Sequence, residues 1–189
     1  MSAMMGLVRR LVIAVLAFAG WSMALAQSAH LDGATAEPTG QASPQRQREV
    51  ARRGADVMPF NLEATTHVFM KTARGGIQKV VAKDPSNLVQ VRLVRAHLRE
   101  IQLQFEHGNF SGPAHIHGQA MPGLAELQAA PQGAITLAYQ QVQAGAQLTY
   151  STRDRKLVAA LHRWFDAQLS DHGKDAMVGH QHHGDMPAR

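Results

Sequence analysis

The sequence of 189 residues contains no cysteine. Disulfides therefore cannot support the fold, and a metal site would have to use histidine, methionine or carboxylate ligands because thiolates are missing. The sequence also has no block of lysines and arginines of the kind that follows a phosphate backbone. We therefore do not expect a nucleic acid as partner.

Long apolar runs are missing as well. The most apolar stretch, "LVIAVLAFAG" (11–20), is shorter than the roughly 20 residues that a membrane-spanning helix needs. It follows Arg9 and Arg10 and precedes "ALA" (24–26), an order that is typical of a secretory signal peptide. We expect cleavage after Ala26 and a periplasmic or secreted protein without stable membrane insertion. About 163 residues remain, enough for one domain, and their net charge falls from +5 to about +3 because two arginines leave.

What the sequence has in excess is histidine. All eleven histidines follow the expected cleavage point, and this enrichment is the main functional clue. Three of them, His180, His182 and His183, stand in a polar tail (175–189) that we expect to be disordered and that also holds Met177 and Met186. Closely spaced imidazoles can wrap one copper or nickel ion without a preformed site. The alternative is a solvated tail without function.

The remaining sequence predicts an α+β domain over 58–174. Residues 27–57 have the composition of a flexible linker with one short helix between Ser43 and Gly54. Two hairpin–helix units follow: strands 62–71 and 77–83 with a helix from Asp84 to Gly108, then strands 134–142 and 147–152 with a helix from Asp154 to Gly173. Each element has one apolar face. The pattern predicts a four-stranded antiparallel sheet with two main helices packed on one face, and 109–133 as the bridge between the units.

The motif "HIH" holds His115 and His117 in a segment rich in glycine and proline, with Met121 behind them. In an extended segment, side chains two residues apart point to the same side, so these two imidazoles would grip one ion together. The alternative is a loop whose imidazoles bond to nearby backbone carbonyls.

Other histidines border apolar faces of the predicted elements. His97 and His162 occupy equivalent positions in the two helices, each ten residues before a second histidine, His107 or His172. If the units are related by a pseudo-two-fold axis, His97 and His162 would meet, with His67, His117 and Asp166 as neighbours. The alternative is that each is a hydrogen-bonded core histidine. The full set of candidate metal ligands is His67, His97, His115, His117, His162, His172, His180, His182, His183 and Met121.

Three stretches carry a resemblance to a family: "TTHVFMKTARGGIQKVVAKD", "VRAHLREIQLQFEHGNFSGPAHIHGQAMPGL" and "GAQLTYSTRDRKLVAALHRWFDAQLSDHG". They resemble motifs of small exported bacterial proteins that are often labelled aspartate carbamoyltransferase. The resemblance covers about 116 residues, from Met58 to Gly173. It places five histidines in recognisable motifs and leaves out those of the tail: His67, His97, His117, His162 and His172.

The residues argue against carbamoyltransferase activity. The segment "STRDR" (151–155) is similar to the Ser-Thr-Arg-Thr-Arg phosphate loop of those enzymes, but Asp154 places a negative charge where the phosphate would lie. The chain has about half the length of such a subunit, lacks a His-Pro-x-Gln loop and is expected outside the cytoplasm, where carbamoyl phosphate is not made. We interpret "STRDR" as a strand end followed by an Asp N-cap.

The sequence thus favours a periplasmic protein that binds a transition metal, copper first and zinc or nickel as alternatives, for buffering, delivery or resistance. Its partners would be the metal ion and another periplasmic protein, and no organic cofactor is implied. An alternative is a metal-independent module for a small anion or protein partner, using Arg92, Arg95, Arg99, Arg153 and Arg155. A third is a metal-dependent hydrolase, although no residue stands out as catalytic and we do not expect an enzyme.

Overall fold

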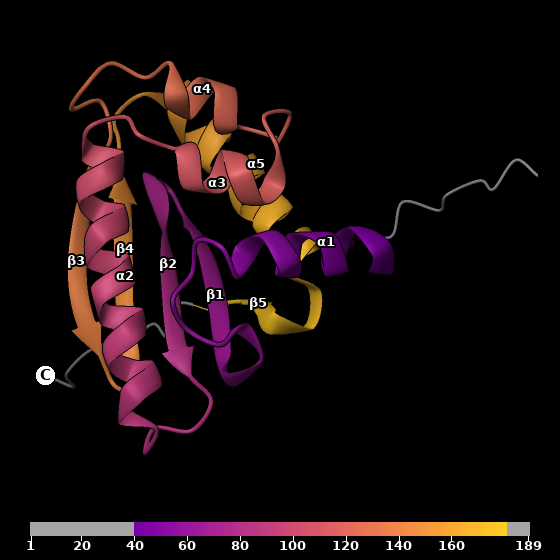
Figure 1. Cartoon of the computed structure of the whole chain (residues 1–189). Coiled ribbons are helices and arrows are strands. Elements are labelled where there is room, and N and C mark those ends of the chain that lie inside the picture. Colours follow the sequence, from indigo (N-terminus) through magenta and orange to yellow (C-terminus); the bar gives the residue numbers. More distant parts are fainter. Residues whose placement is uncertain (1–39, 181–189) are drawn as a thin grey trace, which may run out of the picture. The chain divides into compact units, whose positions relative to one another are not determined.

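The computed structural model describes residues 40–180. The expected signal peptide and the end of the tail, with His182 and His183, lie outside the described residues. The described part is an α+β fold with a five-stranded sheet (Figure 1). Its elements are α1 (Pro44–Gly54), a 3-10 turn η1 (Leu62–Ala64), β1 (Thr65–Thr72), β2 (Gly75–Ala82), α2 (Leu88–Glu106), α3 (Ser111–His117), α4 (Leu124–Gln128), β3 (Thr136–Val142), β4 (Gly145–Ser151), α5 (Arg155–His172), η2 (Gly173–Asp175) and β5 (Ala176–Val178).

Two hairpins form most of the sheet. β1 pairs with β2 and β3 pairs with β4, both antiparallel, and the hairpins join through an antiparallel β2–β4 pair in which Gly75 lies opposite Ser151. Side chains alternate between the two faces of each strand, and on β1 those of His67 and Phe69 are buried. The two predicted hairpin–helix units are therefore present in the predicted order.

The predicted four-stranded antiparallel sheet is wrong in one respect: the sheet has five strands in the order β3-β4-β2-β1-β5 and is mixed. α5 ends at His172, and its C-cap residue Gly173 has a φ of +53°, which favours glycine. The chain then returns through η2. β5 then runs parallel to β1, with Ala176 opposite His67. The beginning of the segment expected as a disordered tail is thus part of the sheet.

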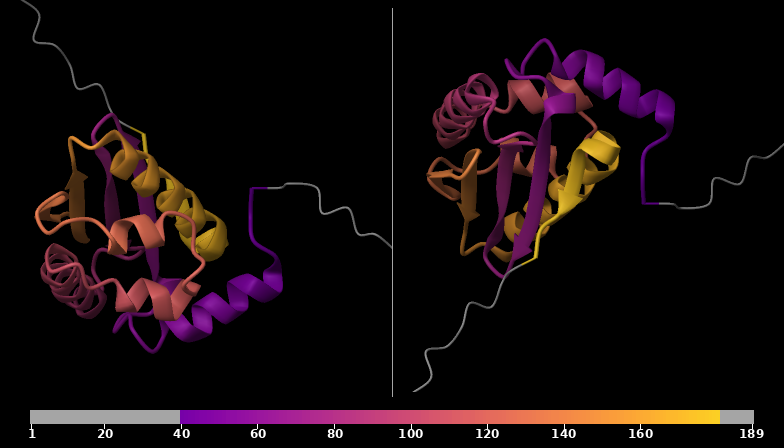
Figure 2. Two further views of the ribbon diagram at one scale, coloured as in Figure 1. Left: turned by 90° about the horizontal axis from the view of Figure 1, so that it is seen from above. Right: turned by 90° about the horizontal axis from the view of Figure 1, so that it is seen from below.

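The two long helices pack on the same face of the sheet, as predicted. α2 contacts β2, β3 and β4, whereas α5 contacts β1, β2 and β5 (Figure 2). Both reach the same inward side chain, because Phe105 of α2 and Trp164 of α5 lie against Tyr150 of β4. The helix starts carry side-chain caps at Asn87 and Asp154.

The segments on either side of the first unit are also folded. Ser43 caps α1, and this helix packs against α3 and α5 with Val50 only 1% exposed. Residues 44–57, expected to belong to a linker, therefore lie within the folded part. The bridge 109–133 contains the two short helices α3 and α4. Among residues 40–180, no helix has the length and hydropathy to cross a membrane.

Candidate functional site

The candidate site is a cavity of about 80 Å³ that is lined by residues of the sheet, α2, α3, α5 and the chain after α1 and is open on one side. Four histidines from four separate elements line it: His67 of β1, His97 of α2, His117 of α3 and His172 of α5. Most other lining residues are apolar. Folding thus brings together imidazoles that are up to 105 positions apart in the sequence.

Three of these rings are in direct contact. His67 stacks on His172 with ring centroids 4.9 Å apart and an interplanar angle of 4°, and the edge of His117 meets His172 at 5.2 Å. Phe60 lies 5.9 Å from the ring of His67 and 5.5 Å from that of His97, and contacts both. His172 is therefore the centre of the cluster, and His97 stands at its edge.

The cluster is not arranged as a finished metal site. Within the described part of the chain, no group of three or more His, Asp or Glu side chains is placed to hold one metal ion. The stack of His67 on His172 explains this, because the nitrogen lone pairs of parallel rings lie in parallel planes and do not converge on one point.

His117 is oriented by a buried carboxylate. Its Nδ1 lies 2.8 Å from Oδ2 of Asp171, and Arg46 donates to both carboxylate oxygens, at 3.1 and 2.7 Å. Burial raises the pKa of Asp171, but hydrogen bonds from His117 and Arg46 outweigh it and hold that pKa at about 2. An ionised carboxylate only accepts, so Nδ1 of His117 carries the proton, and in the neutral ring Nε2 carries the lone pair.

His67 has the opposite tautomer. Its ring donates to the backbone of Asp175, whereas its buried Nδ1 has no hydrogen-bond partner. The donor is therefore Nε2, and Nδ1 of the neutral ring carries a free lone pair. Burial, followed by the nearby His97, lowers the pKa of His67 to about 4.

The rings of His97 and His172 are held in the uncharged form, like that of His67. Burial lowers the pKa of His97, and burial together with the neighbouring His67 and His117 lowers the pKa of His172 well below its ordinary value. At neutral pH His67, His97 and His172 therefore present uncharged imidazoles to the cavity, which is the form that binds metal ions.

One face of α5 forms a wall of the cavity. Trp164, Gln168 and His172 follow each other at four-residue intervals and all line it. The indole N–H of Trp164 is buried and has no hydrogen-bond partner. In residues 40–180, His67 Nδ1 is the other buried side-chain atom of this kind. Trp164, Gln168 and Met58, which also lines the cavity, did not emerge from the sequence analysis, although the spacing of the first two from His172 was a readable signal.

His162 and Asp166 lie elsewhere, and the predicted meeting of His97 with His162 is wrong. Nε2 of His162 donates to the carbonyls of Thr72 and Gly75, at 3.0 and 2.9 Å. Asp166 pairs with Lys71 at the surface. The reason is that the two helices share only β2: α2 also covers β3 and β4, whereas α5 also covers β1 and β5, so equivalent positions of the two helices face different parts of the sheet.

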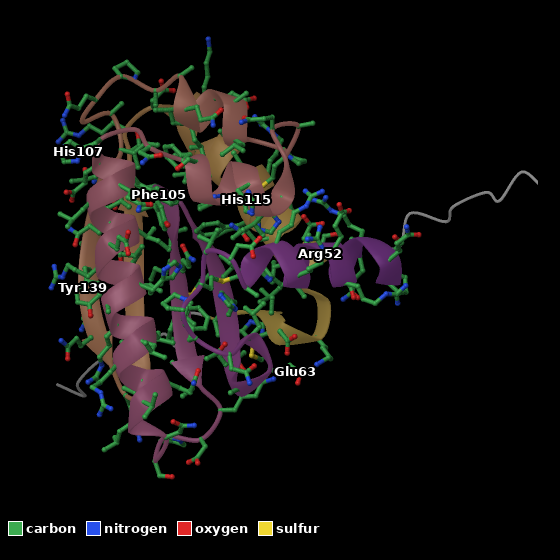
Figure 3. All side chains as sticks on the ribbon, in the orientation of Figure 1. Arg52, Glu63, Phe105, His107, His115 and Tyr139 are labelled. Atoms are coloured by element: carbon green, nitrogen blue, oxygen red, sulfur yellow. The ribbon has the colours of Figure 1, made fainter. Side chains whose placement is uncertain are left out.

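The extended "HIH" arrangement is also wrong, because both residues belong to helix α3. Residues two apart on a helix point in nearly opposite directions. His115 (labelled in Figure 3) is therefore exposed, and its Nε2 lies 3.1 Å from Oδ2 of Asp56. His117 is buried. Met121 is packed in the core and does not line the cavity, and His180 is exposed beside the outer face of the sheet.

The arginines of the alternative anion module are partly engaged in structural roles. Arg95 donates to the carbonyls of Val142 and Gly145, and Arg99 lies 3.8 Å above the ring of Tyr139. Both attach α2 to the second hairpin. In "STRDR", β4 ends at Ser151 and Asp154 caps α5 by accepting from the Lys156 N–H, as interpreted from the sequence.

Comparisons with known proteins give no further guide to this site: no protein-family model, no curated protein and no solved structure matches the chain. The function therefore has to be argued from the cavity itself.

Proposed function

We propose that this protein binds one transition-metal ion in the histidine-lined cavity and serves in metal buffering, delivery or resistance outside the cytoplasm. The observation that carries the proposal is the convergence of four imidazoles on one cavity, where His172 contacts both His67 and His117.

Two of the imidazoles have the outer partners that metal-binding histidines usually have. Asp171 holds His117 through Nδ1, and the backbone of Asp175 holds His67 through Nε2. Such partners fix the tautomer and the ring orientation of a ligand. The nitrogens left with lone pairs are Nε2 of His117 and Nδ1 of His67, and the latter is buried without a partner.

The third ligand requires one movement. A metal–nitrogen bond is about 2.0–2.1 Å long, so His172 has to turn out of its parallel stack before its nitrogen points at an ion shared with the other two rings. His172 is the last residue of α5 and precedes Gly173, so its side chain stands where the regular helix ends.

Copper is the first candidate ion. Uncharged imidazoles suit copper, zinc and nickel, and a thioether ligand favours Cu(I) among them. The cavity offers such a sulfur in Met58 rather than in the predicted Met121. Zinc and nickel remain alternatives for a site that uses the imidazoles alone.

The test is a calorimetric titration of the protein with Cu²⁺ and Zn²⁺ in three forms. A tail variant (H180A/H182A/H183A) isolates the cavity, and adding H67A/H117A to it removes two proposed ligands. Adding H107A/H115A instead is the matched control, since it removes two exposed imidazoles.

We expect the tail variant and the control to bind one ion with a dissociation constant in the micromolar range or tighter, and the cavity variant to lose that binding. Millimolar affinity in the tail variant, at a melting temperature equal to that of the unaltered protein, would refute the proposal.

A further inference from the structure

Two buried glutamines give the cavity amide groups that the fold does not use fully. Gln78 of β2 is 7% exposed and Gln168 of α5 is 5% exposed, and both line the cavity. The Gln78 oxygen accepts from the hydroxyl of Tyr150, whereas no side-chain hydrogen bond within residues 40–180 involves the Gln168 amide. The free amide atoms are not among the fully enclosed unpaired atoms of the described part, so they keep surface that a ligand in the cavity can reach.

The fold alone does not explain these amides. A buried amide without a partner costs free energy that a leucine of similar size would not cost. His97 of α2 adds a third polar group to the cavity, since it is 7% exposed and its ring has no hydrogen bond to the described residues. Three helices and strands thus supply buried donors and acceptors to one space, which is the pattern of a site for a polar organic molecule.

The charges around the cavity favour an uncharged ligand. Among residues 40–180, no lysine or arginine lines it, and burial keeps three of its histidines uncharged. The fourth, His117, already faces the carboxylate of Asp171 together with Arg46. The acidic residue of the lining, Glu100, is exposed. An ionised ligand would therefore be buried without a counter-charge, which is costly.

The size of the cavity and its open side limit the ligand further. The volume of about 80 Å³ is roughly half that of a cavity of about 150 Å³ that holds benzene, so it encloses about three or four non-hydrogen atoms. This is the size of a carboxamide group. Among the partly exposed lining residues, which border the open side, Val57, Ile101 and Pro113 are apolar. They suit a hydrocarbon part that extends outward from the enclosed group.

We propose that the cavity binds a small uncharged carboxamide without the help of a metal ion, through Gln78 and Gln168, with the hydrocarbon part of the ligand toward the open side. The ligand carbonyl accepts from the free N–H groups of the two glutamines, and the ligand N–H donates to the Gln168 oxygen. Neither glutamine is a proposed metal ligand, so this inference goes beyond the proposed function and does not rest on it.

The probes are butyramide and butyrate, which have nearly the same shape and differ in charge. Each is titrated into the full chain at pH 7 with a chelator present and at equal ionic strength, and binding is followed by NMR. We expect butyramide to bind with a dissociation constant in the millimolar range or tighter, and butyrate at least about tenfold more weakly. The side-chain amide signals of Gln78 and Gln168 should shift with butyramide.

The variant Q168L removes the amide and keeps a side chain of similar size. Its affinity for butyramide should fall about fivefold or more, and its melting temperature without butyramide should not fall, because leucine needs no hydrogen-bond partner. The matched control is Q143L, at an exposed position between β3 and β4, which should bind butyramide as the unaltered protein does.

No saturable binding of butyramide, an equal affinity for butyrate, or an unchanged affinity in Q168L would overturn the carboxamide site. A lower melting temperature of Q168L would show that the amide serves the fold and would also overturn it. Because the chelator removes metal ions, none of these results bears on the proposed function, which the calorimetric titration tests separately.

Discussion

The two hairpin–helix units place equivalent histidines in opposite environments. In the first unit, His97 lines the cavity, whereas His107 is exposed and bonds to the Leu103 carbonyl of its own helix. In the second unit, His162 corresponds to His97 and bonds to backbone carbonyls of the first hairpin. His172 corresponds to His107 and lies at the centre of the histidine cluster.

The difference follows from where each helix lies on the sheet. α2 runs over β2, β3 and β4, whereas α5 runs over β1, β2 and β5. His162 therefore meets the turn of the first hairpin, and His172, about 15 Å further along α5, reaches the other end of β1. A repeated spacing in the sequence thus does not imply a symmetric site, and the predictions that follow separate cavity histidines from their counterparts.

The largest effect should be the loss of stability of the metal-free protein in acid. The pKa of His67 is about 4 in the folded chain and near 6.5 when unfolded, so between these values the unfolded chain binds more protons and stability falls as the pH falls. For His67 alone, the free energy of unfolding should fall by about 3 kcal/mol once the pH lies below both pKa values. The pKa values of His97 and His172 are shifted in the same direction, and Asp171 adds a further loss below about pH 3.8.

The measurement is urea unfolding between pH 7 and pH 4 with a chelator present. The substitution H67Q should reduce the pH dependence of the free energy of unfolding. H107Q, at an exposed position, should leave that dependence unchanged. Equal slopes in all three proteins would contradict the assignment of the acid sensitivity to the cavity.

Removing a proposed ligand should have the next largest effect. H117A should weaken metal binding about 100-fold or more, equivalent to about 2.8 kcal/mol, because loss of a ligand costs at least as much as loss of its outer partner. H162A, which removes partly buried hydrogen bonds but no proposed ligand, should bind metal as the unaltered protein does. Competition with a chromophoric chelator would measure both, and a similar loss in the two variants would argue against a site at His117.

The outer partner of His117 should matter less than His117 itself. D171N should weaken metal binding about 10- to 100-fold, because the carboxylate that fixes the tautomer of His117 is lost. D166N is the matched control on the same helix, since Asp166 pairs with Lys71 at the surface. Unchanged metal affinity in D171N would show that the carboxylate has only a structural role, through its ion pair with Arg46.

The smallest expected effect concerns stability at neutral pH. H162A should lower the free energy of unfolding by about 1 to 2 kcal/mol, because two backbone carbonyls lose their shared donor. The comparison variant is H97A, because His97 is the equivalent residue of the first unit and lines the cavity. That variant should keep the hairpin bonds and change metal affinity less than H117A does, since His97 stands at the edge of the cluster. Thermal melts and metal titrations of the two variants measure both expectations.

Much of the fold was readable from the sequence, since pairs of short runs joined by glycine-containing turns indicated the four longer strands and the spacing of apolar residues indicated α2 and α5. β5 was missed because three residues carry no alternation and pair with a strand about 110 positions earlier. α3 was missed because Gly112 and Pro113 suggested a loop, although proline is tolerated in the first turn of a helix.

The site was less predictable than the fold. The sequence grouped His67, His97 and His117, and these three do line one cavity. From the sequence, His162 was expected beside these three, whereas the structure has His172 there. The position of α5 along the sheet depends on tertiary packing, which a local sequence pattern does not indicate. Asp171 and Arg46, which are 125 positions apart, could be joined only by the packing of α1 against α5.

The central claim is that a metal ion is held by cavity histidines and not by the tail. The most direct measurement is the NMR signal of each imidazole nitrogen in the full-length protein during titration with Zn²⁺. Our account predicts that Nδ1 of His67 and Nε2 of His117 shift at one equivalent of zinc while His162 stays unchanged. Shifts confined to His180, His182 and His183 would contradict it.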